Sequence, residues 1–353
     1  MTPDPIATQR EGRVGRITLQ RPEALHALDI RMCELAIRAL LEFRADAAID
    51  LVLIDHAGER GFCAGGDIRM IVESVRTGDD AAARFFRLEY QLDELLFHYP
   101  KPVVVFMDGV VMGGGAGISL PCRYRVVSER TRFAMPEVGI GLFPDVGGSW
   151  HLPRLPRHSG YWLATTGARI AAPDCLWLGI ATHHVPSSAL ATLKAALVAQ
   201  PHAHEQTLAA AAQPPQAAPL AAHADDLTDC FSAPSIEELL SRLERRGTTW
   251  ATAQLDSIAR KSPQALKVAW RLLQTGSRLG DFSENLALEF GLALRCVHTP
   301  DFAEGVRATL IDRDQAPRWR PATLAEVTQA QLDALFEPLP DDRAWTPRRH
   351  ARD

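Results

Sequence analysis

The sequence predicts an α/β core followed by a helical C-terminal region. Within its 353 residues, short apolar runs alternate with segments of helical periodicity through the first half of the chain. Continuous runs rich in β-branched residues are typical of parallel strands that are covered on both faces. No strand signal of comparable strength follows about residue 185, whereas helix start signals recur beyond it.

The predicted elements of the core follow one another in order. Residues 13–19 alternate apolar and polar side chains, which indicates a half-buried opening strand. Residues 29–44 carry apolar side chains at helical spacing. Residues 51–54 and 102–107 are uninterrupted apolar runs and indicate buried strands. The order strand, helix, strand, helix, strand predicts right-handed βαβ crossovers.

The composition divides the chain into three parts. Residues 12–199 form the predicted core, and residues 225–340 form the predicted helical region. Between them, residues 200–224 are rich in Ala and Pro and show no apolar periodicity, which predicts a loop or linker.

Three helices of the C-terminal region have recognisable ends. Ser235 begins a capping box, and an apolar stripe follows it. Another helix starts with Pro263 at its first position and ends at Gly276. Thr323 with Glu326 is predicted to cap a late helix.

Charge, cysteine spacing and apolar runs exclude several classes of protein. Lys+Arg number 38 and Asp+Glu 43, a net charge of −5, so the basic excess of a nucleic-acid-binding domain is absent. The longest apolar stretch, residues 102–121, contains Asp108 and five glycines, which suits a buried strand and turn rather than a membrane span. Six separated cysteines without a CxxC pair, and no apolar signal-like segment near the start, predict a cytoplasmic protein.

Three glycine-rich segments carry the first sign of chemistry. They are residues 61–68, 112–117 and 133–148, and the first two follow predicted strands. Glycine lets a backbone approach a ligand closely, and a glycine run that opens a helix leaves N–H groups free. Two such segments can each direct one N–H at the same oxygen atom, which is an oxyanion hole. The alternative is that these glycines serve only tight turns and close packing.

Two acidic residues in the third segment are candidate catalytic groups. Glu137 follows a proline among apolar and glycine residues, and Asp145 lies eight residues further on. A carboxylate in apolar surroundings tends toward a raised pKa that suits general acid–base work. Helix or turn capping for Asp145 and a surface position for Glu137 are equally open from the local pattern.

Four motifs in the same order resemble those of the crotonase (enoyl-CoA hydratase/isomerase) superfamily. They are GFCAGGDIR (61–69), MGGGAGISL (112–120), FAMPEVGIGLFPDVGGSWHLPRL (133–155) and DFAEGVRATLIDRDQAPRW (301–319). Within the superfamily they are most similar to the 3-hydroxyisobutyryl-CoA hydrolase group, over about residues 12–335. The resemblance implies a crotonase-like spiral of ββα units, with the helical C-terminal region helping to cover an acyl-CoA site.

The resemblance also implies roles for particular residues. Backbone N–H groups of Gly66 and Gly114 correspond to the oxyanion hole. Glu137 and Asp145 correspond to the catalytic carboxylates of the hydrolase group. Substrate contacts correspond to Glu89, Gly114, Glu137 and Asp145. Neither a metal nor a cofactor is implied beyond the CoA of the substrate.

A departure from the hydratase pattern favours hydrolysis. Hydratases of the superfamily carry a catalytic glutamate where this chain has Gly117, and they usually have glycine where it has Asp145. The resemblance therefore implies thioester hydrolysis of a short 3-hydroxyacyl-CoA, foremost 3-hydroxyisobutyryl-CoA in valine breakdown. The alternatives are an enoyl-CoA hydratase or isomerase that uses Glu137 alone, and a non-catalytic acyl-CoA-binding protein.

Expectations about partners follow from the same resemblance. An acyl-CoA is the expected small-molecule partner, and neither nucleic acid nor membrane is expected. Related proteins often assemble, so a homo-oligomer is an open expectation. Arg21, after the first predicted strand, is a candidate contact for the CoA phosphates, with a solvated arginine as the alternative.

Overall fold

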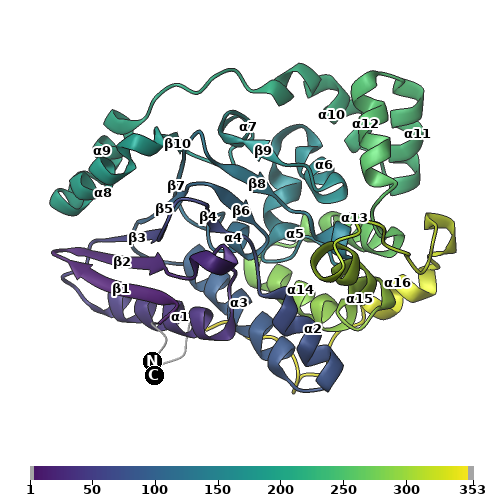
Figure 1. Cartoon of the computed structure of the whole chain (residues 1–353), viewed down its shortest axis with the longest axis horizontal. Helices are drawn as coiled ribbons and strands as arrows, with labels where there is room; N and C mark the ends of the chain where they lie inside the picture. The colour runs from purple at the N-terminus through teal and green to yellow at the C-terminus, as the bar shows by residue number, and fades with distance from the viewer. Residues whose placement is uncertain (1–3, 349–353) are drawn as a thin grey trace.

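The computed structural model describes residues 4–348 and confirms the predicted fold class, a crotonase-like α/β core with a helical C-terminal region (Figure 1). The strands form a six-stranded sheet in the order β1-β2-β3-β5-β7-β10 and a four-stranded sheet in the order β4-β6-β8-β9. The large sheet contains β1 (Ile6–Glu11), β2 (Val14–Leu19), β3 (Leu51–His56), β5 (Val103–Met107), β7 (Tyr124–Val127) and β10 (His183–His184). The small sheet contains β4 (Gly61–Cys63), β6 (Val110–Met112), β8 (Arg132–Ala134) and β9 (Ile170–Ala171).

The repeating unit is two strands followed by a helix. In the pairs β3/β4, β5/β6 and β7/β8 the first strand joins the large sheet and the second joins the small one. Strands β2, β3, β5, β7 and β10 run parallel, which the continuous apolar runs predicted for β3 and β5. The helices between and after these pairs are α1 (Ile30–Ala45), α2 (Ile68–Thr77), α3 (Ala81–Phe97), α4 (Gly114–Gly117), α5 (Gly148–His151), α6 (Ser159–Thr166) and α7 (Ala172–Trp177).

The first strand of the sheet precedes the one that the sequence predicts. Strand β1 pairs antiparallel with β2, with Ile6 opposite Leu19, and the turn between them uses Gly12 at φ 62°. Apart from Ile6, the residues of β1 are partly or fully exposed. This edge strand therefore lacks the apolar alternation by which a half-buried strand is recognised.

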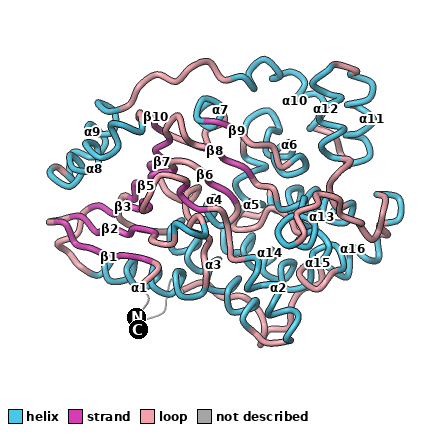
Figure 2. The backbone as a smooth tube through the Cα atoms, in the orientation of Figure 1, coloured by secondary structure: helices cyan, strands magenta, loops and turns pink. Residues whose placement is uncertain are grey.

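The large sheet is covered on both faces. Val52 and Ile54 of β3 belong to the main core, together with side chains of α1 and α3. Leu51 and Leu53 point the other way, into a second core formed with leucines of α8 (Leu190–Ala199) and α9 (His204–Ala211). This alternation follows from the period of two along a strand. Figure 2 shows α8 and α9 on one side of the strands of the large sheet and α1 on the other.

The predicted loop at residues 200–224 is largely wrong. Helix α9 fills residues 204–211, and only residues 212–218 are extended, running from α9 toward α10 in Figure 1. Alanine favours helix even without an apolar stripe, and α9 needs only Leu208, which is fully buried, to attach it to the sheet.

Seven further helices follow this extended segment. They are α10 (Ala224–Phe231), α11 (Ile236–Arg246), α12 (Thr249–Ile258), α13 (Pro263–Gly276), α14 (Phe282–Cys296), α15 (Pro300–Val306) and α16 (Gln329–Leu335). The Ser235 cap of α11 and both ends of α13 are confirmed. None of the helices within residues 4–348 has the length and apolar composition that a membrane span requires.

The cap of the late helix lies five residues after the predicted position. Only a 3₁₀ turn, Leu324–Glu326, follows Thr323. In this turn the Glu326 carboxylate accepts a hydrogen bond from the backbone N–H of Ala322. Thr328 and Gln331 form the capping box of α16 instead, each side chain accepting from the backbone N–H of the other. The same Thr-x-x-acceptor spacing occurs twice in succession, and only the second copy precedes a stable helix.

Candidate active site

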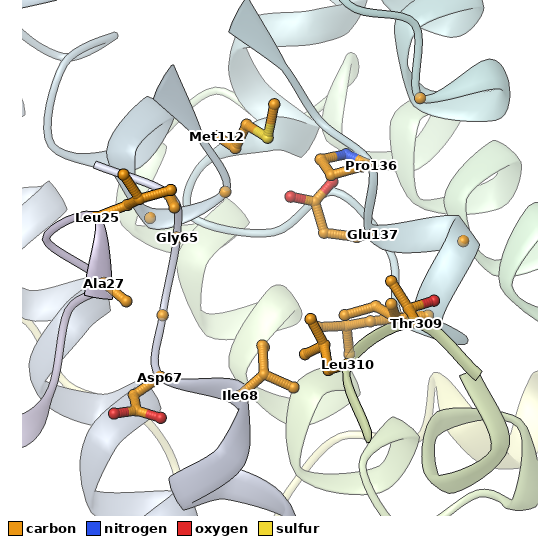
Figure 3. A pocket seen from close by; sticks show the side chains of 18 of the residues that line it. Leu25, Ala27, Gly65, Asp67, Ile68, Met112, Pro136, Glu137, Thr309 and Leu310 are labelled. Atoms are coloured by element: carbon orange, nitrogen blue, oxygen red, sulfur yellow. The ribbon is translucent and has the colours of Figure 1, made fainter. Parts of the chain in front are cut away.

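One cavity of about 1500 Å³ collects the residues that the sequence singles out. Its wall includes the first two glycine segments, the 3₁₀ turn Glu137–Ile140 and residues of the C-terminal region such as Lys261 and Leu310. In Figure 3, the Glu137 side chain points into the cavity from the side opposite Gly65, and Leu310 lies below it. The C-terminal region thus helps to enclose the site, as predicted.

The two glycine segments lie against each other at this cavity. A Cβ atom built on Gly114 would lie 3.4 Å from the carbonyl carbon of Gly65. The first segment is fixed from behind, because Leu28 donates to Gly65 O at 2.7 Å and accepts from Asp67 N at 2.8 Å. Among the hydrogen bonds of residues 4–348, none uses the backbone N–H of Gly66 or Gly114 as donor. Two unused donors therefore come from neighbouring segments of the cavity wall.

The carboxyl groups of Glu137 and Asp145 line the same cavity. Both are buried, at 6% and 5% exposure. Burial, and then repulsion by Asp145, raises the pKa of Glu137 well above its usual range. Burial also raises the pKa of Asp145, to about 6. Burial therefore excludes a surface position for Glu137, and the raised pKa values make both carboxyl groups candidates for proton transfer.

A tyrosine that the sequence analysis did not single out holds Asp145 in place. The hydroxyl of Tyr90 donates to Asp145 Oδ2 at 2.8 Å and favours its ionised form. Tyr90 is fully buried on α3. Tyr90 directly follows Glu89 in the chain. This adjacency to a predicted substrate-binding residue was the only feature of the sequence that pointed to it.

Glu89 completes the acidic wall. It lies on α3, is 2% exposed and lines the cavity. Its Oε1 atom would overlap a Cβ built on Gly114 and would lie 3.8 Å from one built on Gly66. Burial, Asp145 and Glu137 all raise its pKa well above the usual range. The five residues of the predicted site therefore lie together around one space.

The turn after Asp145 is strained and is held by a buried acid. Val146 has φ 53°, a conformation that β-branched residues rarely adopt, and Gly147 follows at φ 81°. Glu289 of α14 accepts from Gly147 N at 2.7 Å and from Ser149 N at 2.8 Å. A lone buried acid among apolar residues of a helix was the signal that could have revealed Glu289. It fixes the turn that positions Asp145.

Glu289→Gln is expected to lower stability most at acidic pH. Burial raises the pKa of Glu289 from 4.5 to about 8. The Glu289 carboxyl group holds its proton more tightly in the folded protein than in the unfolded chain. The stability that this protonated group contributes is therefore complete below about pH 4.5 and is lost as the pH rises to about 8. Glutamine stays neutral but presents an N–H₂ group to one backbone N–H, at a cost of about 1–3 kcal/mol. Urea unfolding at pH 5, 7 and 9 measures the free energy of unfolding of the variant and of the wild type. The difference between them should become smaller as the pH rises. A difference that stays constant with pH would contradict this role.

Arg21 is already engaged, which counts against it as the phosphate contact. Its guanidinium lies 2.8 Å from Asp67 and 3.4 Å from Asp29, and it donates to Ala27 O. Other cationic residues of the cavity wall have no ion pair within residues 4–348. They are Arg60, Arg69, Arg169, Arg260, Lys261 and Arg313. An acidic interior with a cationic surround suits a ligand that carries phosphates at one end and a reactive carbonyl at the other.

The fold and the site define a member of the enoyl-CoA hydratase/isomerase family, and the sequence matches that family over residues 14–336. The chain belongs to it. Among curated relatives, the mitochondrial 3-hydroxyisobutyryl-CoA hydrolases of Homo sapiens and Gallus gallus are 40% and 39% identical over 343 residues. Each alignment covers 95% of this chain and 89% of the relative.

Two solved structures are similar over nearly the whole chain. A carnitinyl-CoA dehydratase from Mycobacterium thermoresistibile has a TM-score of 0.92 at 37% identity and covers 96% of this chain and 98% of its own. An enoyl-CoA hydratase from Rhodobacter sphaeroides 2.4.1 has a TM-score of 0.87 at 37% identity and covers 97% and 99%.

Proposed function

We propose that this protein hydrolyses the thioester of a short 3-hydroxyacyl-CoA, foremost 3-hydroxyisobutyryl-CoA, to the free hydroxy acid and CoA. The observation that carries the proposal is the placement of Glu137 and Asp145 in one cavity with the unused N–H groups of Gly66 and Gly114. The near full-length similarity to 3-hydroxyisobutyryl-CoA hydrolases supports it.

Each residue has a distinct part in the proposed reaction. The N–H groups of Gly66 and Gly114 bind the thioester oxygen and stabilise its negative charge as the tetrahedral adduct forms. Glu137 either attacks the carbonyl carbon and forms an anhydride, or removes a proton from a water that attacks it. Asp145 positions that water. Breakdown of the adduct expels CoA thiolate, which takes up a proton to leave as thiol.

A single-turnover reaction in ¹⁸O-labelled water distinguishes the two routes. Attack by Glu137 predicts that the label enters the Glu137 carboxyl group when water opens the anhydride on that side. Direct attack by water predicts that all of the label is in the hydroxy acid. Mass spectrometry of the peptide that contains Glu137 measures the difference.

Glu89 provides selectivity for the hydroxyl of the acyl group in this proposal. It lines the cavity next to the two glycine segments, so a substrate oxygen bound there places its β-hydroxyl within reach of a carboxylate. The unpaired cationic residues of the cavity wall would hold the CoA phosphates. The curated relatives are named as mitochondrial, so a cytoplasmic location of this chain, like its homo-oligomeric state, stays a prediction.

The alternative is hydration or isomerisation of an enoyl-CoA; the two similar solved structures are of a carnitinyl-CoA dehydratase and an enoyl-CoA hydratase. Position 117 argues against it here. A Cβ built on Gly117 would lie 2.7 Å from Val146 and 2.9 Å from Asp93, so this site has neither an acid at position 117 nor the space for one. Hydration would have to use Glu137 with a partner in a different place.

The test of the proposal is release of free CoA thiol from 3-hydroxyisobutyryl-CoA by the purified protein. We expect turnover with 3-hydroxyisobutyrate identified as the second product. A non-catalytic acyl-CoA-binding protein would bind the thioester without releasing thiol, and Asp145→Asn would then change nothing. That pair of results would overturn the proposal.

Tyr90→Phe is expected to move the acid limb of the kcat/KM profile to higher pH. With a pKa of about 6, Asp145 is ionised above that pH and loses its charge below it. A hydrogen bond to a charged group contributes roughly 1.5–3 kcal/mol, so its loss should shift the limb upward by about one to two pH units. Rates of thiol release between pH 5 and 9 measure the shift. An unmoved limb would show that Asp145 does not control it.

A further inference from the structure

Asp93 is a buried carboxyl group that the proposed chemistry does not use. It lies on α3 one turn after Glu89 and is fully shielded from solvent. Neither of its carboxyl oxygens has a hydrogen-bond partner within residues 4–348. A buried polar group without a partner is destabilising, so its presence in a native core calls for an explanation.

The packing of α3 on α4 pairs two carboxyl groups with two glycines. Glu89 Oε1 occupies the place of a Cβ at Gly114, and both oxygens of Asp93 lie 2.9 Å from a Cβ built at Gly117. The glycines are one turn apart on α4, as the acids are on α3. The bare backbone at Gly117 therefore makes room for Asp93, and a carboxyl group reaches the side-chain position of residue 117 from behind the cavity.

Electrostatics decides which of the two acids carries a proton. Two buried carboxyl groups at i and i+4 repel each other and do not both ionise. Glu89 lines the cavity, whereas Asp93 is absent from its wall, so the charge is better solvated on Glu89. Burial raises the pKa of Asp93 strongly, and neighbouring acids raise it further. The titratable groups around Asp93 are Glu89 on α3, Asp145, Glu289 on α14 and the thiols of Cys33, Cys63 and Cys122.

None of these surrounding groups is a cation, so within residues 4–348 none of the charges that act on Asp93 offsets a negative charge on it. As a neutral acid, Asp93 has one O–H donor that needs an acceptor. Glu89, one helical turn away on the same face of α3, is the candidate acceptor, because its Oε1 atom also has no hydrogen-bond partner within residues 4–348. A donor behind Glu89 favours the ionised form of Glu89 and restricts its orientation.

We propose that Asp93 is a positioning residue: as a neutral carboxylic acid it donates a hydrogen bond to Glu89 and keeps the Glu89 carboxylate directed at the hydroxyl of the substrate. The inference rests on the proposed function, in which Glu89 binds that hydroxyl. It assigns the selectivity for hydroxyacyl groups to a pair of residues on α3, of which only Glu89 touches the substrate.

The test compares two substrates in three proteins. The ratio of kcat/KM for 3-hydroxyisobutyryl-CoA to that for isobutyryl-CoA, which lacks the hydroxyl, is measured from pH 5 to 9. Asp93→Leu removes the donor and should lower the ratio about tenfold. In this variant the ratio should also begin to fall at a higher pH than in the wild type, because Glu89 is then protonated more readily. Asp93→Asn keeps a neutral donor and should restore the ratio to within about threefold of the wild type.

If the ratio of kcat/KM values falls at a lower pH in both Asp93→Leu and Asp93→Asn than in the wild type, Asp93 is ionised and the proposal is overturned. An unchanged ratio in Asp93→Leu would overturn it as well, because Asp93 would then only fill space. Infrared spectroscopy provides a readout without substrate: the wild type should show a protonated-carboxyl band that Asp93→Asn lacks, and absence of that band also overturns the proposal.

The outcomes separate this inference from the proposed function. If Asp93→Leu does not fold, the infrared band and the pH dependence of the kcat/KM ratio in Asp93→Asn still show whether Asp93 is a neutral hydrogen-bond donor. Thiol release by the wild type with no preference for the hydroxyl would leave the hydrolase in place and overturn the role of Asp93. The infrared band without any thiol release would overturn the hydrolase and support the neutral state of Asp93.

Discussion

Glu137→Gln is expected to lower kcat for thiol release about 10³-fold and to leave KM within a few-fold of the wild type. The amide has the shape of the acid but can act neither as a nucleophile nor as a general base. Glu137 is 6% exposed, and its Oε2 atom has no hydrogen-bond partner within residues 4–348, so an amide N–H₂ group placed at that atom replaces no hydrogen bond. Steady-state kinetics of CoA release measures the effect.

Glu244→Gln is the matched control. Glu244 is exposed on α11 and does not line the cavity, so the same chemical change there should leave kcat unaltered. Thermal unfolding of both variants should match the wild type within a few degrees. If Glu137→Gln retains a tenth or more of the wild-type kcat, Glu137 is not the reacting group.

Gly114→Ala is expected to reduce kcat/KM by about 10²–10³, the effect of losing one oxyanion-hole donor. The new methyl group would overlap Glu89 Oε1 and lie 3.1 Å from Leu28 Cδ1. The backbone at residue 114 and the Glu89 carboxyl group must therefore move apart. This movement turns the N–H of residue 114 away from the thioester oxygen and displaces Glu89. Both kcat and the preference for a hydroxyl in the substrate should fall together.

Gly280→Ala tests whether the added methyl group alone is harmful. A Cβ at Gly280 meets nothing within 4 Å, and its φ is not in the left-handed region. Activity and stability should stay near wild type there. Wild-type turnover by Gly114→Ala would show that this N–H does not bind the reacting oxygen.

Elements with their own local signal were predictable from the sequence. Apolar runs gave β3 and β5, and cap residues gave the ends of α11 and α13, because burial and capping act over a few neighbouring residues. Strand β1 was missed because an exposed edge strand has no apolar pattern. Helix α9 was missed because it is anchored to the sheet by the single buried side chain of Leu208.

The site was predictable where a motif carries it. The family resemblance supplied Gly66, Gly114, Glu89, Glu137 and Asp145, and the structure brings all of them to one cavity.

The residues that act through these five were not predicted. Tyr90, Asp93 and Glu289 acquire their importance only when α3 and α14 pack beside the turn that follows Asp145. Spacing alone could have drawn attention to Asp93, since it lies four residues after Glu89. The engagement of Arg21 by two acids distant in sequence was equally invisible.

The most direct test of the account sets hydrolysis against hydration in one preparation. Release of thiol from 3-hydroxyisobutyryl-CoA and loss of the enoyl absorbance of crotonyl-CoA are followed with the same purified protein at pH 8. For a hydrolase with this site we expect kcat/KM for thiol release to be larger by about two orders of magnitude or more, since catalytic groups typically contribute 10²–10⁴. Equal rates, or faster hydration of crotonyl-CoA, would contradict it.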